Sequence, residues 1–172
     1  MTLTNQDKRQ PRGQLRVESL TEAQARDILT WRYPPPYDFY DPPGDDQGER
    51  YVRAFLDPVL AFHGVMDEAG EFLGFCSFGL DGQVPGGDYT LPALDIGLGM
   101  KPQFTGQGIG PYFFAAILAF ASGIPGTATY RLSVARFNKR ALRLYGQFGF
   151  LNAGEFVDTR FGIPYCILVR PA

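Results

Sequence analysis

A strand, a glycine-rich turn and an apolar helix follow one another between residues 93 and 121, and this segment constrains the fold most. The run ALDIGLGM over 93–100 is typical of a buried strand, and PYFFAAILAFA over 111–121 is typical of a buried helix. GQGIG at 106–110 joins the two, and Pro111 suits the first turn of a helix. Because backbone N–H groups at such a helix start bind phosphate, the segment predicts an anion site in an α/β domain.

Two familiar glycine-rich motifs do not fit this turn. A Walker A loop requires a lysine after its glycines, and none follows here. A dinucleotide fingerprint requires G-x-G-x-x-G and an acid about twenty residues later, whereas this chain has G-x-G-x-G and no acid before Glu155. Both motifs are excluded, and a purely structural turn remains the alternative to an anion site.

The other elements are expected on both sides of this segment. LRVES over 15–19 predicts a strand, and the pair Thr21 and Gln24 predicts a capping box for a helix that ends near Tyr33. Five prolines and five aromatic residues within 31–44 predict a rigid, extended loop. Asp46 is expected to cap a second helix.

The strands and the last helix follow from periodicity and turn residues. Runs 58–67 and 71–80 predict an antiparallel hairpin around a turn at 68–70. A strand over 130–135, a helix capped by Asn138 that ends near Phe148, and strands over 154–160 and 164–170 complete the order. We expect a flexible tail over 1–14 and one α/β (α+β) domain over 15–172, with a mixed sheet and helices on both faces.

Histidine and cysteine usage excludes several kinds of site. The only histidine, His63, lies in the apolar run LAFHGVM, where a satisfied, partly buried imidazole is the simpler interpretation. Cys76 and Cys166 lie in apolar runs without any CxxC, so we expect core residues, no disulfide and no zinc site. The polar N-terminus and the short apolar stretch over 112–121 predict a cytoplasmic protein without a membrane span.

Charge is balanced in sum but segregated along the chain. The net charge of −2 argues against binding to nucleic acid or to a membrane surface. The 59 residues between Asp95 and Glu155 contain no carboxylate and six cations. The cations are Lys101, Arg131, Arg136, Lys139, Arg140 and Arg143. This pattern indicates two differently charged surfaces, or one cleft with two kinds of ligand.

A second motif follows the glycine-rich turn and reads N-x-x-A-x-x-L-Y-x-x-x-G-F. Its positions are Asn138, Ala141, Leu144, Tyr145, Gly149 and Phe150. Over about residues 93 to 155 the chain resembles the GNAT superfamily of acyl-CoA-dependent N-acetyltransferases, whose loop motif is R/Q-x-x-G-x-G/A. Thr105 stands where that family usually has Arg or Gln, and Gln103 lies nearby as a partial substitute. Since the family's loop works through backbone amides, we expect a weaker but working phosphate site.

The resemblance implies acetyl-CoA as co-substrate, without a metal, and a sheet of about seven strands with about four helices. It also implies that the fourth and fifth strands diverge at a bulge to admit pantetheine. Gly97 and Gly99 suit such a bulge, or they merely relieve crowding against the buried helix. Residues implied in binding the pyrophosphate and pantetheine are Leu98, Gly99, Met100, Gln107, Gly108, Ile109, Gly110, Pro111, Tyr112 and Asn138. Arg136, Lys139 and Arg140 are candidates for the 3′-phosphate, or form only a solvated helix face.

Acetyl transfer to an amine requires a proton acceptor, an oxyanion donor and an acid for the departing thiolate. The resemblance implies Tyr145 as the acid, with packing between helix and sheet as the alternative. It implies Asp95 as the base, with a structural acid as the alternative. The backbone N–H of Leu98 or Gly99 is the expected oxyanion donor.

The resemblance implies that the first two helices form part of the acceptor site, and the aromatic loop between them carries Trp31, Tyr33, Tyr37 and Tyr40. Six acids cluster around it, namely Asp38, Asp41, Asp45, Asp46, Glu49 and Asp57. An acidic, aromatic pocket suits a cationic amine, either a small molecule or a peptide, and the alternative is a loop that only packs its aromatic rings on the core. We therefore expect an N-acetyltransferase that acts by direct transfer in a ternary complex. A non-catalytic acyl-CoA sensor, a longer acyl donor and a homodimer stay open.

Overall fold

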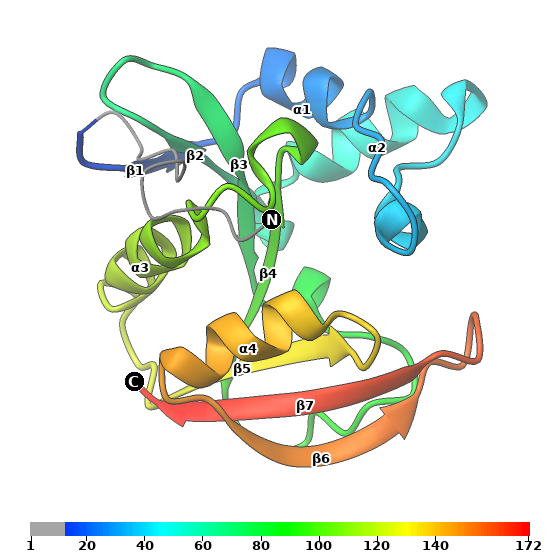
Figure 1. Cartoon of the computed structure of the whole chain (residues 1–172), viewed down its shortest axis with the longest axis vertical. Coiled ribbons are helices and arrows are strands. Elements are labelled where there is room, and N and C mark those ends of the chain that lie inside the picture. The colour runs from blue at the N-terminus through cyan, green and yellow to red at the C-terminus, as the bar shows by residue number, and fades with distance from the viewer. Residues whose placement is uncertain (1–12) are drawn as a thin grey trace, which may run out of the picture.

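The computed structural model describes residues 13–172, apart from the side chain of Asp45. One seven-stranded sheet has the order β1-β2-β3-β4-β5-β7-β6 (Figure 1). Its strands are β1 (Arg16–Ser19), β2 (His63–Met66), β3 (Phe72–Phe78), β4 (Leu94–Met100), β5 (Thr129–Ala135), β6 (Leu151–Val157) and β7 (Pro164–Pro171). Every pairing is antiparallel except β4–β5. The mixed sheet and the order of elements predicted from the sequence are confirmed.

In the described part of the chain, four α-helices flank the sheet, and they bury two separate cores. The helices are α1 (Glu22–Ile28), α2 (Gly48–Phe55), α3 (Gly110–Ala121) and α4 (Lys139–Gln147). Cys76 packs with α3 and α4, whereas its neighbour Phe75 packs with α1 and α2. Because consecutive strand residues point to opposite faces, the helices cover both faces of the sheet, as predicted.

Several boundaries differ from those that the sequence predicted. The capping box of Thr21 is present, but α1 already ends at Ile28, before the proline run. The aromatic loop is not simply extended, because Tyr37–Tyr40 form a short 3-10 helix. Asp46 does not cap α2, whose N-terminus at Gln47 has no side-chain cap.

The strand predicted over 58–67 also begins later than expected. Pro58–Leu60 form a 3-10 turn that Asp57 caps through the N–H of Val59, and Ala61 then adopts a left-handed conformation. This turn delays the strand to His63. Helix α3 is also less buried than predicted, since it exposes Tyr112.

The fourth and fifth strands diverge. They pair only through Leu94 with Tyr130 and Asp95 with Arg131. The bulge expected near Gly97 and Gly99 is absent, because β4 keeps an unbroken register with β3. The structure instead supports the crowding alternative, although the crowding comes from β3. A Cβ on Gly99 would meet the Phe75 ring, and one on Gly97 would meet the Ser77 hydroxyl.

The remaining sequence expectations concern single residues and the N-terminus. His63 holds its Nδ1 2.8 Å from the carbonyl oxygen of Ala61, and its ring packs on Phe120. Cys76 and Cys166 are buried and unbridged. The predicted tail over 1–14 lies outside the described residues except for its last two, Gly13 and Gln14. Within the described part, no helix combines the length and apolar character that a bilayer span requires.

Candidate active site

A cavity of about 760 Å³ opens where β4 and β5 separate. Residues 96–100 of β4 form one wall and residues 132–134 of β5 another. Helices α1 and α2 close one end, and the start of α3 together with α4 closes the other. The size is typical of a ligand site. The expected site residues that line it are Trp31, Tyr33, Tyr37, Tyr40, Leu98, Gly99, Met100, Gly108, Gly110, Pro111, Asn138, Arg140 and Tyr145.

The backbone of β4 presents polar groups to this cavity. At both ends of the strand, odd-numbered residues bond to β3. Such bonds alternate residue by residue in an antiparallel pair, so even-numbered residues direct their N–H and C=O groups toward the gap with β5. Met100 follows this rule, since its carbonyl oxygen accepts a hydrogen bond from the Tyr33 hydroxyl at 2.7 Å. Of the two oxyanion donors that the sequence left open, the register favours the N–H of Leu98 over that of Gly99.

The glycine-rich turn uses its side chains to hold its own shape. The Thr105 hydroxyl donates to the carbonyl oxygen of Pro102 at 2.8 Å, and the Gln107 amide donates to that of Gln103. Gly106 and Gly108 have φ angles of +74° and +82°, which a residue with a Cβ rarely adopts. The first N–H groups of α3 have no partner within the helix and lie at this end of the cavity. The turn is thus built to offer backbone donors to an anion.

Three expected contacts on this turn lie away from the cavity surface. Ile109 is buried in the core, Tyr112 is exposed on the outer side of α3, and the Gln107 side chain folds back onto the turn. Gln103, considered as a substitute for the missing Arg or Gln, is exposed and does not line the cavity. Any contribution from these positions comes from the backbone.

Tyr145 lines the cavity from α4. Its ring packs on Phe114, with ring centres 4.8 Å apart, and the residue is buried. Burial raises the pKa of Tyr145 above the ordinary value, and Tyr40 adds to this effect. No hydrogen bond to another described residue occupies its hydroxyl. The group is therefore a protonated donor available to a ligand.

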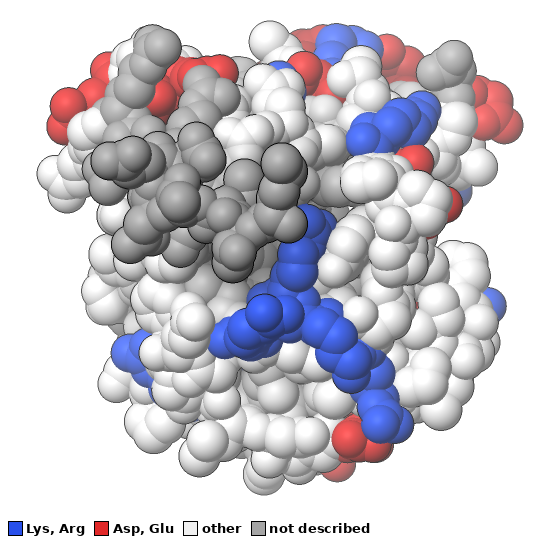
Figure 2. Space-filling model, in the orientation of Figure 1, with Lys and Arg blue, Asp and Glu red and all other residues white. Residues whose placement is uncertain are grey.

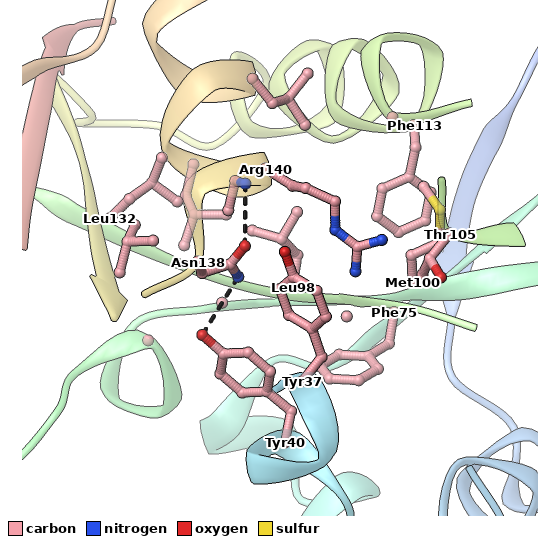
Figure 3. Close-up of a pocket in the computed structure, with 18 of the residues that line it drawn as sticks. Tyr37, Tyr40, Phe75, Leu98, Met100, Thr105, Phe113, Leu132, Asn138 and Arg140 are labelled. Carbon is pink, nitrogen blue, oxygen red and sulfur yellow. Dashed lines mark hydrogen bonds between the residues drawn. The ribbon is translucent and has the colours of Figure 1, made fainter. Parts of the chain in front are cut away.

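Asn138 joins α4 to the aromatic loop across the cavity. Its side-chain oxygen accepts from the N–H of Ala141 at 3.1 Å, which confirms the predicted helix cap. Its amide nitrogen donates to the Tyr40 hydroxyl at 3.3 Å (Figure 3). Beside it, the Arg140 guanidinium lies 3.8 Å from the centre of the Tyr37 ring. The loop thus reaches from α1 to α4 and forms part of the cavity wall.

Basic side chains are unevenly placed around the cavity. Figure 2 shows Lys and Arg as a band across the middle of one face, over α4, with most of the visible Asp and Glu at the upper rim and a smaller group at the lower end of the band. Arg140 lines the cavity, and so does Arg143, which the sequence did not single out as a phosphate ligand. Arg136 forms an ion pair with Glu155 at 3.4 Å, and Lys139 does not line the cavity. Of the three candidates for a phosphate, the geometry favours Arg140.

Asp95 does not line the cavity. Its carboxylate is buried and receives two hydrogen bonds from Arg131, at 2.6 and 2.8 Å, and one from Gln83 at 2.9 Å. Both oxygens are therefore occupied within the protein. The expected role as general base has no support in this geometry, and the alternative of a structural acid fits it.

The aromatic residues of the loop differ in role. Trp31 is 4% exposed, donates its indole N–H to Asp27, and stacks on Phe75. It therefore belongs mainly to the core and contributes only part of its surface to the cavity. Tyr37 and Tyr40 face the cavity more directly, from the 3-10 helix.

The acidic wall expected around this loop is absent from the described residues. None of the expected carboxylates with a described side chain lines the cavity. Asp41 accepts from the N–H of Tyr33, Asp57 caps its turn, and Glu49 pairs with Arg26 at 2.7 Å. These acids stabilise the local backbone or the surface, so the sequence cluster does not become a cluster in the cavity.

Among the described side chains, the carboxylate that lines the cavity is Asp81, which the sequence did not single out. It sits in a 3-10 turn, Leu80–Gly82, directly after β3. Its Oδ2 accepts a hydrogen bond from the Ser77 hydroxyl at 2.6 Å and lies over Gly97 of β4. Nothing in the local sequence distinguishes Asp81 from other loop acids, because its position depends on the β3–β4 pairing.

Comparisons with known proteins identify the family and the fold. A model of the acetyltransferase (GNAT) family matches residues 23–150. No curated protein matches the chain. A mutant form of the spermidine/spermine N-acetyltransferase SpeG from Vibrio cholerae is 18% identical, with a TM-score of 0.66 over 92% of this chain and 95% of that chain. A putative acetyltransferase from Acinetobacter baylyi ADP1 is 15% identical, with a TM-score of 0.62 over 92% of this chain and 93% of that chain. At these identities the likeness to solved structures shows a shared fold.

Proposed function

The chain belongs to the acetyltransferase (GNAT) family and is an acyltransferase, and from this premise we propose that it transfers the acetyl group of acetyl-CoA directly to a primary amine. The observation that carries the proposal is the cavity between β4 and β5, which combines a Leu98 backbone N–H, the Tyr145 hydroxyl and a turn with anion-binding amides. Amide formation requires these kinds of donor. The reaction needs both substrates in the cavity together, in a ternary complex.

The cavity fits acetyl-CoA at its α3–α4 end. Gly108 and Gly110 would offer backbone N–H groups to the pyrophosphate, and Arg140 would meet a phosphate as a cation. When bound, acetyl-CoA supplies a thioester carbonyl that is open to attack by an amine. Thr105 replaces the Arg or Gln that is usual in the family. This replacement removes no backbone N–H donor from the turn, because the Thr105 hydroxyl bonds only within the turn itself.

Two groups of the protein act on the reacting atoms in this proposal. The N–H of Leu98 donates to the oxygen on which negative charge develops, as in other oxyanion sites. The Tyr145 hydroxyl gives its proton to the departing sulfur. The pKa of Tyr145 is raised by burial, so the hydroxyl stays protonated at neutral pH.

The acceptor in this proposal is a small-molecule amine. The solved structures with a similar fold include enzymes named for spermidine and spermine, which are small amines. The aromatic loop crosses the cavity to the start of α4, where Tyr40 bonds to Asn138 and Tyr37 stacks with Arg140. A cavity crossed by such a loop suits a small molecule better than an extended peptide.

The test is release of free thiol from acetyl-CoA in the presence of a panel of primary amines, with mass spectrometry of the acetylated product. We expect amine-dependent release above the rate of thioester hydrolysis without amine. Binding of acetyl-CoA with no turnover on any amine would favour a sensor. Faster turnover with a longer acyl-CoA would show that acetyl-CoA is not the preferred donor. Failure to bind any acyl-CoA would contradict the proposal.

A further inference from the structure

The acceptor end of the cavity is walled almost entirely by apolar and aromatic side chains. Its side chains come from α1, α2, β3 and the segments that follow α1 and precede β2, and they are Ile28, Trp31, Tyr51, Phe55, Phe62 and Phe75. These rings pack on one another, with centres 4.9 Å apart for Phe55 and Phe62 and 5.6 Å apart for Phe62 and Phe75. The wall is thus a continuous apolar surface, held in place by its own packing.

Charged groups around the whole cavity are few. Among the side chains that the structure describes, those lining it are Asp81, Arg140 and Arg143. The two arginines come from α4, at the end proposed for the phosphates. Asp81 is therefore the one described carboxylate that faces a ligand in this cavity.

Asp81 is placed beside the proposed reaction centre. A Cβ on Gly97 would lie 3.0 Å from Asp81 Oδ2, so the carboxylate rests directly on β4, one residue before Leu98. The Ser77 hydroxyl fixes Oδ2 at 2.6 Å. Asp81 is an exposed residue that also lines the cavity, so a ligand in the cavity can reach it. Loss of hydration of the carboxylate against the surrounding protein raises the pKa of Asp81 above the ordinary value, and the Ser77 hydrogen bond offsets part of this rise.

We propose that the acceptor is a primary monoamine on an apolar, largely aromatic body, and that Asp81 binds its ammonium group and takes a proton from it. The inference rests on the proposed function and names its substrate class. One carboxylate can compensate one ammonium. A polyamine would place further charges against apolar walls, and burying an unpaired charge is costly.

The proton balance is complete without another reactant. The ammonium gives one proton to Asp81, which passes it to solvent, and the neutral nitrogen then forms the new C–N bond as the C–S bond breaks. Tyr145 gives its proton to sulfur and regains one from the nitrogen. In sum, an alkylammonium and a thioester become an amide, a thiol and one released proton.

The first experiment compares phenethylamine and tryptamine with spermidine as acceptors for the full chain. We expect kcat/KM to be at least about tenfold higher for the aromatic monoamines than for spermidine. Spermidine would bury unpaired charges against the apolar wall, whereas an aromatic ring gains apolar contact with it. A higher kcat/KM for spermidine would overturn the inference and leave acetyl transfer intact.

A second measurement separates the inference from the proposed function. Calorimetry of phenethylamine with the protein saturated in CoA reports binding without chemistry. Saturable binding, weakened by Asp81→Asn, supports the inference even if no amine turns over, in which case only the proposed function fails. Absence of binding and of turnover for both monoamines overturns the inference.

Variants test the two parts of the site. Asp81→Asn is expected to lower kcat/KM for phenethylamine roughly a hundredfold, the scale of one general base, with the KM for acetyl-CoA unchanged. Asp88→Asn, in the same loop but outside the cavity, is the matched control and should retain activity. Tyr51→Glu adds a second carboxylate to the apolar wall and should shift preference toward spermidine. Full activity of folded Asp81→Asn would overturn the role of this residue.

Discussion

At the scale of single residues, Tyr145 combines a packed ring with an available hydroxyl. The ring is fixed by Phe114 and Phe150, while the hydroxyl reaches the cavity. The ring of Tyr145 therefore packs in the core, while its hydroxyl is the group available for chemistry. Removing the hydroxyl alone separates these roles, because phenylalanine keeps the ring.

We expect Tyr145→Phe to lower kcat about a hundredfold or more, as for loss of a general acid, while acetyl-CoA affinity stays nearly unchanged. Steady-state kinetics and calorimetry measure the two quantities. Because the pKa of Tyr145 is raised, wild-type kcat should not fall through its ionisation up to about pH 10. The control is Tyr130→Phe, a buried tyrosine outside the cavity. An unchanged kcat in Tyr145→Phe would remove the general-acid assignment.

At the scale of elements, the meeting point of β4 and β5 determines where the cavity begins. The last residue pair before the strands diverge is Asp95 with Arg131, and their side chains form a buried ion pair. Arg131 also donates to the carbonyl oxygen of Leu91 at 2.8 Å and lies over the Tyr89 ring. The pair thus fastens the two strands and the preceding loop at the closed end of the gap.

Asp95→Ala is expected to destabilise the fold by about 3–5 kcal/mol, because it leaves the Arg131 charge buried without a partner. Urea unfolding measures this difference. The matched control is Glu18→Ala, which removes an exposed pair with Arg16 and should cost less than about 1 kcal/mol. If both variants proved equally stable, the fastening role of Asp95 would be wrong.

In the glycine-rich turn, an effect on acetyl-CoA binding can be distinguished from an effect on fold stability by comparing two glycine variants. Gly108→Ala and Gly126→Ala both force a Cβ into a positive φ, at +82° and +79°, and should each cost about 1–2 kcal/mol. We expect Gly108→Ala to raise the KM for acetyl-CoA and Gly126→Ala to leave it unchanged, since Gly108 lines the cavity and Gly126 does not. Equal KM values in the two variants would argue against the phosphate site.

At the scale of the whole molecule, the charge segregation in the sequence is partly cancelled by folding. Three of the six cations in the acid-free segment pair with acids at or beyond its ends: Lys101 with Asp27, Arg131 with Asp95 and Arg136 with Glu155. Among the described residues, the other three form no such pair, and Arg140 and Arg143 line the cavity. The cationic surface for a phosphate is therefore smaller than the sequence suggests, and it is concentrated on α4.

Arg140→Ala should raise the KM for acetyl-CoA by about three- to tenfold, since a charged hydrogen bond is lost. The increase should shrink at high salt and with acetyl-dephospho-CoA if Arg140 meets the 3′-phosphate. Arg136→Ala is the control, because its charge is already paired, and it should change KM less than twofold. A larger increase in this KM for Arg136→Ala than for Arg140→Ala would assign the phosphate contact to Arg136 instead.

The order of the elements, the capping of α1 and α4, and the turn before α3 could all be predicted from the sequence. Each depends on residues close together in the chain, such as Thr21 with Gln24 or Asn138 with Ala141. Periodicity and capping act within one or two turns, so they can be predicted from consecutive residues. The end of α1 and the start of β2 differ from the prediction, since α1 already ends at Ile28, before the proline run, and the turn at Ala61 delays β2.

Which carboxylate faces the cavity, in contrast, depends on how distant strands pair in the fold. Asp95 looked suitable in the sequence, yet the pairing of β4 with β5 brings it against Arg131, 36 positions further on. Asp81 looked ordinary, yet the register of β3 with β4 lays it over Gly97. A charge pairs with whatever the fold places beside it, and strand register, not local sequence, sets those neighbours.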